Sequence, residues 1–265
     1  MAGFALRRAE QPGGIALSGV GVIEIAYHRL LAVRSLHFQT IEQIEAGPTP
    51  ETITTTGVAT GVENGLSGAS ERALTTSVTP QGKVAVETIL THRVLYVRRV
   101  VPSPTALGTA QYFGYRVSSS GPPPSLGVQN PLHAVPVTLL LRFAQSGVVT
   151  TSQSTKIDGQ VVTRYQAQLK IGAILQSDAA GIPSTLRSDI RHMGNDAPVA
   201  LWINRYGQLL REVVTVPFTV SGYQFYTIDT LNFSEYNTSV AVTAPPISQV
   251  TFENSLSKLL QAVEG

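Results

Sequence analysis

The sequence predicts an α+β protein built on one curved antiparallel β-sheet of about ten or eleven strands, with about three or four helices on one face. The 265 residues are 43% hydrophobic but only 14% charged, against about 25% in an average soluble protein. Threonine, serine, valine and glycine take the place of charged residues, which favours strands and turns. Strand-like segments follow one another without helix-length segments between them, which indicates an antiparallel meander.

Two groups of strands are expected. In the first group, "SLHFQTIEQIEA" begins an alternation of polar and apolar residues, and turn signals such as "PQGK" separate later members. That group continues through residues 53–60, 69–79, 83–91, 94–101 and 111–118. The second group comprises "GVVTTSQSTKIDGQVVTRYQAQLKIGAIL", the segment 198–214, and strands near 218–231 and 239–243.

Helices are expected where apolar residues recur every three or four positions. Ile23, Ala26, Tyr27, Leu30 and Leu31 make one apolar face, so residues 18–34 form an amphipathic helix. Three later segments have the same pattern, at 132–146, 182–193 and 252–263.

Two hairpins have recognisable turns. Asp158-Gly159 is a strong signal for a two-residue turn. The segment "PVALWINRYGQLLREVV", residues 198–214, turns through "NRYG", where Gly207 can adopt the left-handed conformation. This second hairpin also holds the only tryptophan in the chain, Trp202.

The second hairpin is apolar on both faces. Val199, Leu201 and Ile203 point one way, and Ala200 and Trp202 point the other. An open sheet with helices on one face should alternate more cleanly. Two explanations remain: helices, loops or a dimer partner cover the second face, or the sheet curls around its helices and encloses an apolar cavity.

The chain is expected to form a single domain over residues 1–265, with an N-terminal tail at 1–17 and a C-terminal helical extension at 247–265. The run "SSSGPPPSLGVQNP", residues 118–131, is either a linker between domains or a long surface loop. The loop is favoured because the segments on either side resemble parts of one sheet.

Charge, cysteine content and hydropathy exclude several classes. The net charge is +2, and the densest basic cluster places Arg98 and Arg99 on opposite faces of a strand, so nucleic-acid binding is not expected. With no cysteine, disulfides and thiolate metal sites are excluded. The longest apolar stretch is broken by Glu24 and His28, so no membrane-spanning helix is expected, and no export signal is evident.

No catalytic or metal-binding motif stands out, so no enzyme activity, metal or other cofactor is predicted. The five histidines are scattered and form no metal-ligand spacing. No G-x-S-x-G motif is present, and the S-x-x-K match at 255–258 lacks the motifs that accompany it in enzymes. Asp229 and Glu235 are the strongest of the weak carboxylate candidates.

The order of elements and two short motifs resemble a known family. The hairpin at 199–211 and the closing segment "VAVTAP" at 240–245 are similar to a "vWid..G.l.R" hairpin and a "v.v..P" strand. Both recur in the LppX/LprG group of actinobacterial lipoproteins, relatives in fold of the LolA lipoprotein carrier. The likeness in order covers nearly the whole chain, although this chain has no lipidated cysteine and its last helix extends past the usual closing strand.

The resemblance implies a half-barrel, a sheet wrapped around helices, that binds lipid or lipidated molecules in an apolar cavity and carries them outside the cytoplasm, in the cell envelope or as a secreted protein. It also implies a lipid or acylated ligand, and leaves room for an envelope protein partner and peripheral membrane association. The loop at 118–131 and the helix at 182–193 are the candidates for opening the cavity. Face assignment gives the residues expected to line it: Phe38, Tyr96, Leu140, Phe143, Leu169, Ile171, Leu186, Leu201, Trp202, Ile203 and Phe225.

The alternative is an envelope sensor or protein-interaction module of the same fold that does not transport lipid. A third alternative, an enzyme using carboxylates or tyrosines inside the cup, requires at least two acidic groups that converge in the cavity.

Overall fold

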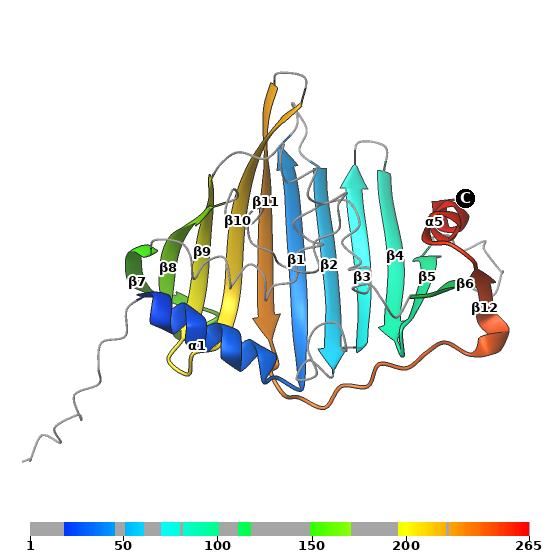
Figure 1. Cartoon of the computed structure of the whole chain (residues 1–265), viewed down its shortest axis with the longest axis horizontal. Coiled ribbons are helices and arrows are strands. Elements are labelled where there is room, and N and C mark those ends of the chain that lie inside the picture. The colour runs from blue at the N-terminus through cyan, green and yellow to red at the C-terminus, as the bar shows by residue number, and fades with distance from the viewer. Residues whose placement is uncertain are drawn as a thin grey trace, which may run out of the picture.

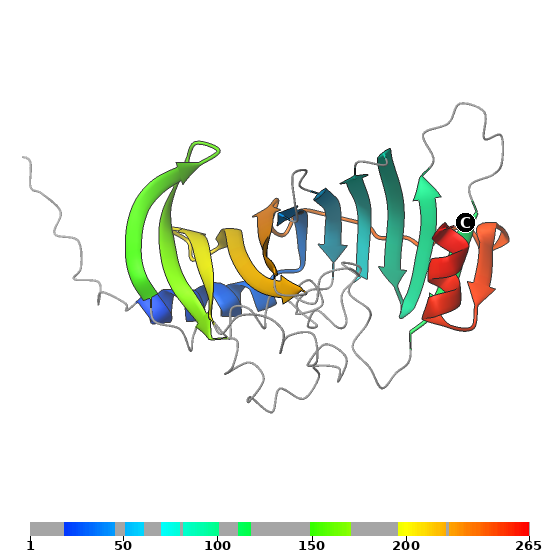
Figure 2. The ribbon, with the colours of Figure 1, turned by 90° about the horizontal axis from the view of Figure 1, so that it is seen from above.

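The structure is a computed structural model that describes residues 19–45, 51–60, 70–79, 82–100, 111–117, 149–170, 196–220 and 223–264. Within these residues twelve strands form one sheet, accompanied by two α-helices and one short 3-10 helix. The sheet is strongly curved and does not close on itself (Figures 1 and 2). The predicted α+β half-barrel is confirmed, with one strand more than the upper expectation.

The described elements follow the chain in a simple order. They are α1 (Gly19–Leu31), β1 (Ser35–Glu45), β2 (Glu51–Thr60), β3 (Ser70–Thr79), β4 (Gly82–Thr91), β5 (Val94–Val100), β6 (Tyr112–Arg116), β7 (Val149–Ile157), β8 (Gln160–Lys170), β9 (Asp196–Asn204), β10 (Leu209–Val220), β11 (Tyr223–Ser234), η2 (Ile247–Gln249), β12 (Val250–Glu253) and α5 (Leu256–Glu264).

The two expected groups of strands form the two halves of the sheet. The strand order is β12-β6-β5-β4-β3-β2-β1-β11-β10-β9-β8-β7. All neighbours pair antiparallel except β12, which runs parallel to β6. The first and last long strands, β1 and β11, join the halves in the middle, whereas β6 and β7, consecutive along the chain, lie near opposite edges.

Both α-helices pack on one side of the sheet, here called the helix face. Strand register shows this, because one continuous row of directly paired residues joins the core beneath α1 to the core beneath α5. The row is Leu201, Glu212, Leu231, Thr40, Thr55, Thr75 and Val86. Figure 2 shows both helices on the same side of the strands. The other side is here called the outer face.

The core beneath α1 confirms the predicted amphipathic helix. Ile23, Ala26 and Leu30 are fully or almost fully buried on the sheet side of α1. They pack in one cluster with Leu201 and Ile203 of β9, which are equally buried. At about 25 cal/mol per Å² of apolar surface, this cluster is a main source of stability in this half of the sheet.

The C-terminal helix packs over the other end of the helix face. Leu259 and Val263 of α5 are buried against Leu90 of β4 and against Leu95 and Val97 of β5. The segment therefore joins the core of the sheet, with β12 adding a strand to its edge.

The chain after β11 runs past the ends of the central strands to reach β12 (Figure 1), and near β12 it contacts the outer face. Val242 and Val250 pack against a small buried cluster of Ile89, Tyr96 and Tyr112. The prediction of a strand at 239–243 is wrong, because these residues have no strand pairing in the described structure. Val242 instead packs on the strands of the outer face.

Two other boundaries differ from the sequence prediction. Residues predicted as one strand near 218–231 belong to two strands, β10 and β11, which pair through Phe218 and Phe225. The last helix begins at Leu256 because the Ser255 hydroxyl accepts a hydrogen bond from the backbone N–H of Lys258, as an N-cap does. Phe252, expected in that helix, lies in β12.

Both predicted hairpins are confirmed. Asp158 and Gly159 have φ values of 48° and 79° and connect β7 to β8. Gly207 has φ of 72° in the turn between β9 and β10, the left-handed conformation expected there. The predicted helices at 132–146 and 182–193, the loop at 118–131 and the tail at 1–17 lie outside the described residues.

Candidate functional site

A groove of about 980 Å³ opens on the outer face, towards the end of the sheet where β7 and β8 curve most (Figure 2). Its floor comes from β1, β2, β10 and β11, and the turn between β7 and β8 forms one wall. Apolar and polar residues both line it: Val58, Ile157, Leu210 and Tyr236, and His37, Gln39, Thr56, Asp158, Gln160, Gln208, Arg211, Asn232, Ser234 and Glu235. Phe38 and Phe233 border it, but their side chains belong to the helix face. The groove therefore offers surface to a ligand that has both apolar and polar parts.

The polar floor of the groove is organised by hydrogen bonds across three strands. The Arg211 Nε group donates to Asn232 Oδ1 at 2.6 Å. Asn232 Nδ2 donates in turn to Gln39 Oε1 at 3.3 Å. These three residues lie directly opposite one another in the register of β10, β11 and β1. The chain of bonds fixes the position of the Arg211 guanidinium at the edge of the groove.

At one end of the groove, His37 and Glu235 form an exposed pair, with His37 Nε2 3.1 Å from a Glu235 carboxylate oxygen. Glu235 follows β11 and has a positive φ of 49°. Because both side chains are exposed to solvent, the pair adds little stability.

Trp202 lies on the outer face beside the groove, directly opposite Arg164 of β8 and Arg211 of β10. The Cζ atoms of these arginines are 5.2 Å and 5.9 Å from the centroid of the indole ring. Both distances allow cation–π attraction. The tryptophan is thus held between two positive charges.

The other end of the same face has a different arrangement of arginines. Glu87 of β4 accepts hydrogen bonds from Arg72 and Arg98, and one from the Tyr112 hydroxyl at 2.8 Å. Burial alone raises the pKa of Glu87, but the bonds from Tyr112, Arg72 and Arg98 outweigh it, so the pKa lies below its ordinary value. Burial and the bond to Glu87 raise the pKa of Tyr112.

The helix face carries buried carboxylates between the two helices. Glu42, Glu212 and Asp229 are almost fully buried on three adjacent strands, β1, β10 and β11. Neither Glu212 oxygen has a hydrogen-bond partner among the residues that the structure describes. Burial, together with the Asp229 charge, raises the pKa of Glu212 to about 8. Burial raises the pKa of Glu71, on the same face, to about 7. This part of the interior is therefore less apolar than the sequence predicts.

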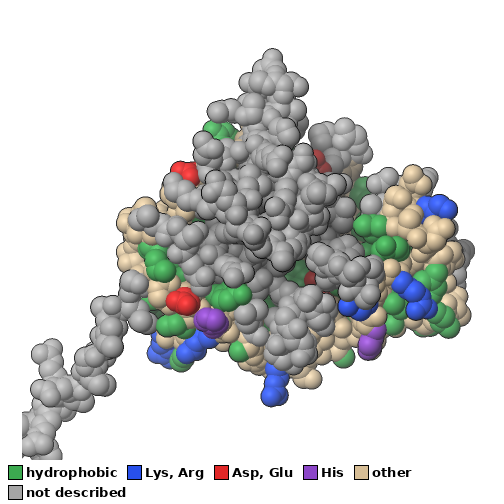
Figure 3. Space-filling model, viewed as in Figure 1, with side chains coloured by type: hydrophobic (Ala, Val, Ile, Leu, Met, Phe, Trp, Pro, Cys, Tyr) green, Lys and Arg blue, Asp and Glu red, His purple; other side chains and the backbone are tan. Residues whose placement is uncertain are grey.

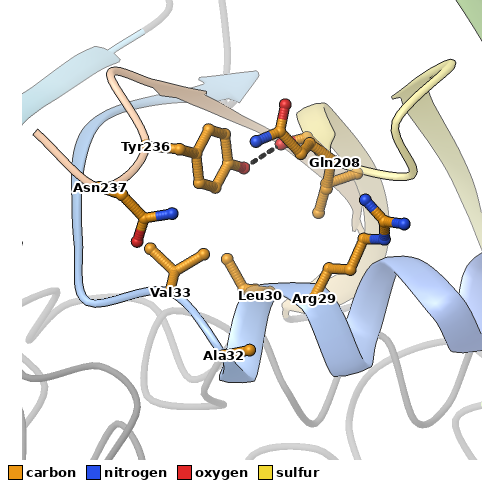
Figure 4. A pocket seen from close by; sticks show the side chains of 8 residues that line it. Arg29, Leu30, Ala32, Val33, Gln208, Tyr236 and Asn237 are labelled. Atoms are coloured by element: carbon orange, nitrogen blue, oxygen red, sulfur yellow. Dashed lines mark hydrogen bonds between the residues drawn. The ribbon is translucent and has the colours of Figure 1, made fainter.

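A smaller pocket of about 160 Å³ lies at the C-terminal end of α1 (Figure 4). Leu30 and Val33 line one side, and the Tyr236 hydroxyl donates a hydrogen bond to the Leu209 carbonyl on the other. Burial raises the pKa of Tyr236, so the hydroxyl stays protonated as a donor. The space suits a few water molecules and is too small for an acyl chain.

The predicted cavity residues on the second hairpin separate to the two faces of the sheet. Leu201 and Ile203 lie in the packed core beneath α1 and line neither pocket. Trp202 points to the outer face between its two arginines. The Phe38 side chain lies on the helix face with Thr40 and packs beside the same core, so Phe38 only borders the groove.

The remaining candidates are spread along the sheet. Tyr96 is buried on the outer face, with its ring centroid 6.4 Å from that of Phe252 in edge-to-face contact. Phe225 is half-buried in β11, and Leu169 lies in β8. Four candidates lie outside the described residues: Leu140, Phe143, Ile171 and Leu186.

The carboxylates singled out in the sequence do not converge. Asp229 is buried on the helix face, whereas Glu235 is exposed beyond the end of β11. The two residues are roughly 20 Å apart along the chain, at about 3.3 Å per residue.

Among the described residues no group of three histidine, aspartate or glutamate side chains is arranged to hold a metal ion. On the described part of the helix face, apolar and charged side chains are interspersed (Figure 3).

The arrangement around Trp202 depends on an irregularity in the hairpin. The register between β9 and β10 shifts between Leu209 and Arg211. Without this shift, Trp202 would lie opposite Leu210, on the basis of the Ile203–Leu209 pair. The arginines near Trp202 in the sequence could have indicated that they contact its ring. The alternation of polar and apolar residues does not reveal a one-residue register shift, however, so the pairing could not be predicted.

Within the described residues no helix is both long enough and apolar enough to cross a bilayer. No known protein-family model and no curated protein matches the chain.

Several solved structures are similar to this one in coarse arrangement. LprF from Mycobacterium bovis is 13% identical with a TM-score of 0.47, covering 85% of this chain and 96% of its own. A DUF1329 family protein from Desulfovibrio piger is 10% identical with a TM-score of 0.30; the match covers 84% of this chain and 93% of that protein. An outer membrane lipoprotein-sorting protein domain from Vibrio parahaemolyticus is 14% identical with a TM-score of 0.26, covering 83% and 93%.

Proposed function

We propose that this protein binds lipid or lipidated molecules without chemically changing them and carries them outside the cytoplasm. The observation that carries the proposal is the groove of about 980 Å³ on the outer face. Its volume is near the upper end of the roughly 300–1,000 Å³ typical of ligand sites.

The lining of the groove fits an amphiphile better than a purely apolar ligand. Val58, Ile157 and Leu210 supply apolar contact, and each buried CH₂ of an acyl chain contributes about 0.8 kcal/mol. Arg211 and Asn232 supply hydrogen-bond donors on the floor. A ligand with a short apolar part and a polar head group satisfies both kinds of surface.

The sequence resemblance to the LppX/LprG group supports the ligand class and the extracytoplasmic location. The proposal includes the expected cavity residues outside the described part of the chain, namely Leu140, Phe143, Ile171 and Leu186, as contacts for the apolar part of the ligand. It also includes peripheral contact with a membrane when the ligand is taken up or released.

Native mass spectrometry of the purified protein, followed by organic extraction, tests the proposal. We expect bound lipid that extraction removes. Val58→Trp should lower lipid occupancy, because the indole would fill part of the groove. Val78→Trp is the matched control, since Val78 lies on the outer face, is 50% exposed and does not line the groove. A protein that stays lipid-free and ignores added lipid would contradict the proposal.

The second candidate function is an envelope sensor or protein-interaction module. It is favoured by β7, which ends the sheet and pairs only with β8 within the described residues. Most of its side chains are exposed and polar, and an edge strand of this kind can accept a strand from a partner. The lipid-free mass described above is the result that favours this function.

A further inference from the structure

Two arginines on the outer face have no carboxylate partner in the described part of the chain. Arg164 and Arg211 lie on either side of Trp202, in direct register with it. Neither forms an ion pair with a described residue. The Arg164 Nε atom is buried and makes no hydrogen bond to a described residue. Among the described contacts, Arg211 donates only through its Nε group, to Asn232.

At the opposite end of the same face, two arginines are neutralised by a carboxylate of the protein itself. There Arg72 and Arg98 share one acidic group, Glu87, with the nitrogen of Arg72 2.7 Å from a carboxylate oxygen. Glu87 also belongs to the cross-strand row that contains Trp202. The row is Arg164, Trp202, Arg211, Asn232, Gln39, Thr56, Leu74, Glu87 and Arg98. At the Trp202 end an aromatic ring stands where the other end has the carboxylate.

An aromatic ring attracts a guanidinium but does not neutralise its charge. Arg164 and Arg211 are two strand spacings apart, about 10 Å, so their positive potentials add at the edge of the groove. A guanidinium has five N–H donors in a planar fork that matches the oxygens of a phosphate or carboxylate. The bond to Asn232 orients that fork while leaving the outer nitrogens of Arg211 to donate elsewhere.

We propose that the groove recognises an oxyanion on its ligand, such as the phosphate of a lipid head group, with Arg211 as the donor and Arg164 as a second positive charge behind Trp202. The inference rests on the proposed function for the lipid that carries the oxyanion. Two acidic side chains also line the groove, but neither pairs with Arg211. Glu235 pairs with His37, and Asp158 lies on the wall formed by the turn between β7 and β8.

Trp202 makes the inference directly measurable, since it is the only tryptophan in the chain. Its emission reports events beside both arginines. The probes are dihexanoyl phosphatidic acid, dihexanoylglycerol, which has the same chains without the phosphate, and inorganic phosphate. Each is titrated into the full chain while tryptophan emission is recorded, with calorimetry as an independent measure of affinity.

We expect phosphatidic acid to bind at least about tenfold more tightly than dihexanoylglycerol, as a charge-assisted hydrogen bond would give. Arg211→Gln should weaken binding of phosphatidic acid at least about tenfold and so remove this preference. Arg205→Gln is the matched control, because Arg205 is an exposed arginine in the adjacent turn that does not line the groove. Arg164→Lys, which keeps the charge, should retain most of the preference. Circular dichroism confirms that each variant is folded.

The outcomes separate this inference from the proposed function. Equal affinity for the two lipids, unchanged by Arg211→Gln, overturns oxyanion recognition and leaves lipid binding intact. Saturable binding of inorganic phosphate that needs Arg211, with no binding of either lipid, supports the oxyanion site and overturns the lipid as its source. Binding of none of the three probes overturns both.

Discussion

Glu212 and Asp229 lie on adjacent strands of the helix face, with Asp229 two residues from Leu231, the residue directly opposite Glu212. Both side chains are almost fully buried. Burial, together with the Asp229 charge, raises the pKa of Glu212 to about 8. The folded protein therefore holds a proton on Glu212 at neutral pH, whereas the unfolded chain does not.

Stability should consequently fall as the pH rises from about 4.5 to about 8, because over this window the folded state binds one more proton at Glu212 than the unfolded state. One proton changes the free energy of unfolding by about 1.4 kcal/mol per pH unit. Glu212→Gln keeps the shape without the titration. We expect the variant to be more stable than the parent at pH 7.5, and the two to converge near pH 4.5. Urea unfolding at a series of pH values measures both.

Glu71 provides the comparison for Glu212. Burial raises its pKa to about 7, so Glu71→Gln should remove a similar slope that ends one pH unit lower. If Glu212→Gln leaves the pH dependence of unfolding unchanged, Glu212 is not protonated in the folded state and the interpretation of its burial is wrong.

Glu87 should have the opposite pH dependence. Its folded pKa lies below the ordinary value because the bonds from Tyr112, Arg72 and Arg98 outweigh the effect of burial. Its contribution to stability is present above the unfolded pKa and is lost as the pH falls through the folded pKa.

Glu87→Gln should reduce the free energy of unfolding by about 1 to 3 kcal/mol at pH 7, since it leaves Arg72 and Arg98 without their shared charge. This loss of stability is smaller than expected for a fully buried ion pair, because the Arg72 side chain is 54% exposed. Glu51→Gln is the control, because Glu51 accepts one hydrogen bond from the Ser77 hydroxyl, and it should cost less than about 1 kcal/mol. Equal losses for the two variants would argue against a special role for the Glu87 cluster.

Much of the fold followed from local signals. The 3.6-residue periodicity of α1 and the Asp158-Gly159 turn are properties of neighbouring residues, and the structure has both where they were expected. The repeated strand segments predicted the sheet, because alternation and turns recur along the chain.

The candidate site needed information that local patterns do not contain. The pairing of Trp202 with Arg164 and Arg211 depends on a register shift in one hairpin and on the pairing of β9 with β8. The groove also depends on curvature, which brings the turn at Ile157 and Asp158 towards β1 and β2. The apolar residues on both faces of β9 correctly indicated that both faces make contacts. On the helix face they pack beneath α1, and on the outer face Trp202 contacts arginines.

Leu259 should be essential for holding α5 on the sheet. It is fully buried among Leu90, Leu95 and Val97, so Leu259→Ala removes apolar contact and leaves a cavity. We expect a loss of about 2 to 4 kcal/mol in the free energy of unfolding. Lys258→Ala, at the exposed neighbouring position, should change stability by less than about 0.5 kcal/mol. A small effect of Leu259→Ala on unfolding, with a large effect on the rate of ligand release, would instead identify α5 as a movable lid.

Gly57 should reject even a methyl group, although glycine normally weakens a strand. A Cβ atom there would lie 2.6 Å from the Arg72 carbonyl oxygen and 2.6 Å from Phe38 Cζ. Gly57→Ala would otherwise stabilise β2 by about 0.5 to 1 kcal/mol, because alanine loses less backbone entropy than glycine. We expect a loss of about 1 to 3 kcal/mol instead, measured by urea unfolding.

Adding Phe38→Leu removes the ring that a Gly57→Ala methyl group would meet, but leaves the Arg72 carbonyl in place. A double-mutant cycle should therefore show that part of the Gly57→Ala penalty disappears when Phe38 is leucine. A penalty that remains whole would place the conflict in the backbone between β2 and β3. A stabilising Gly57→Ala would mean that the two strands are not as close at this point as the structure has them.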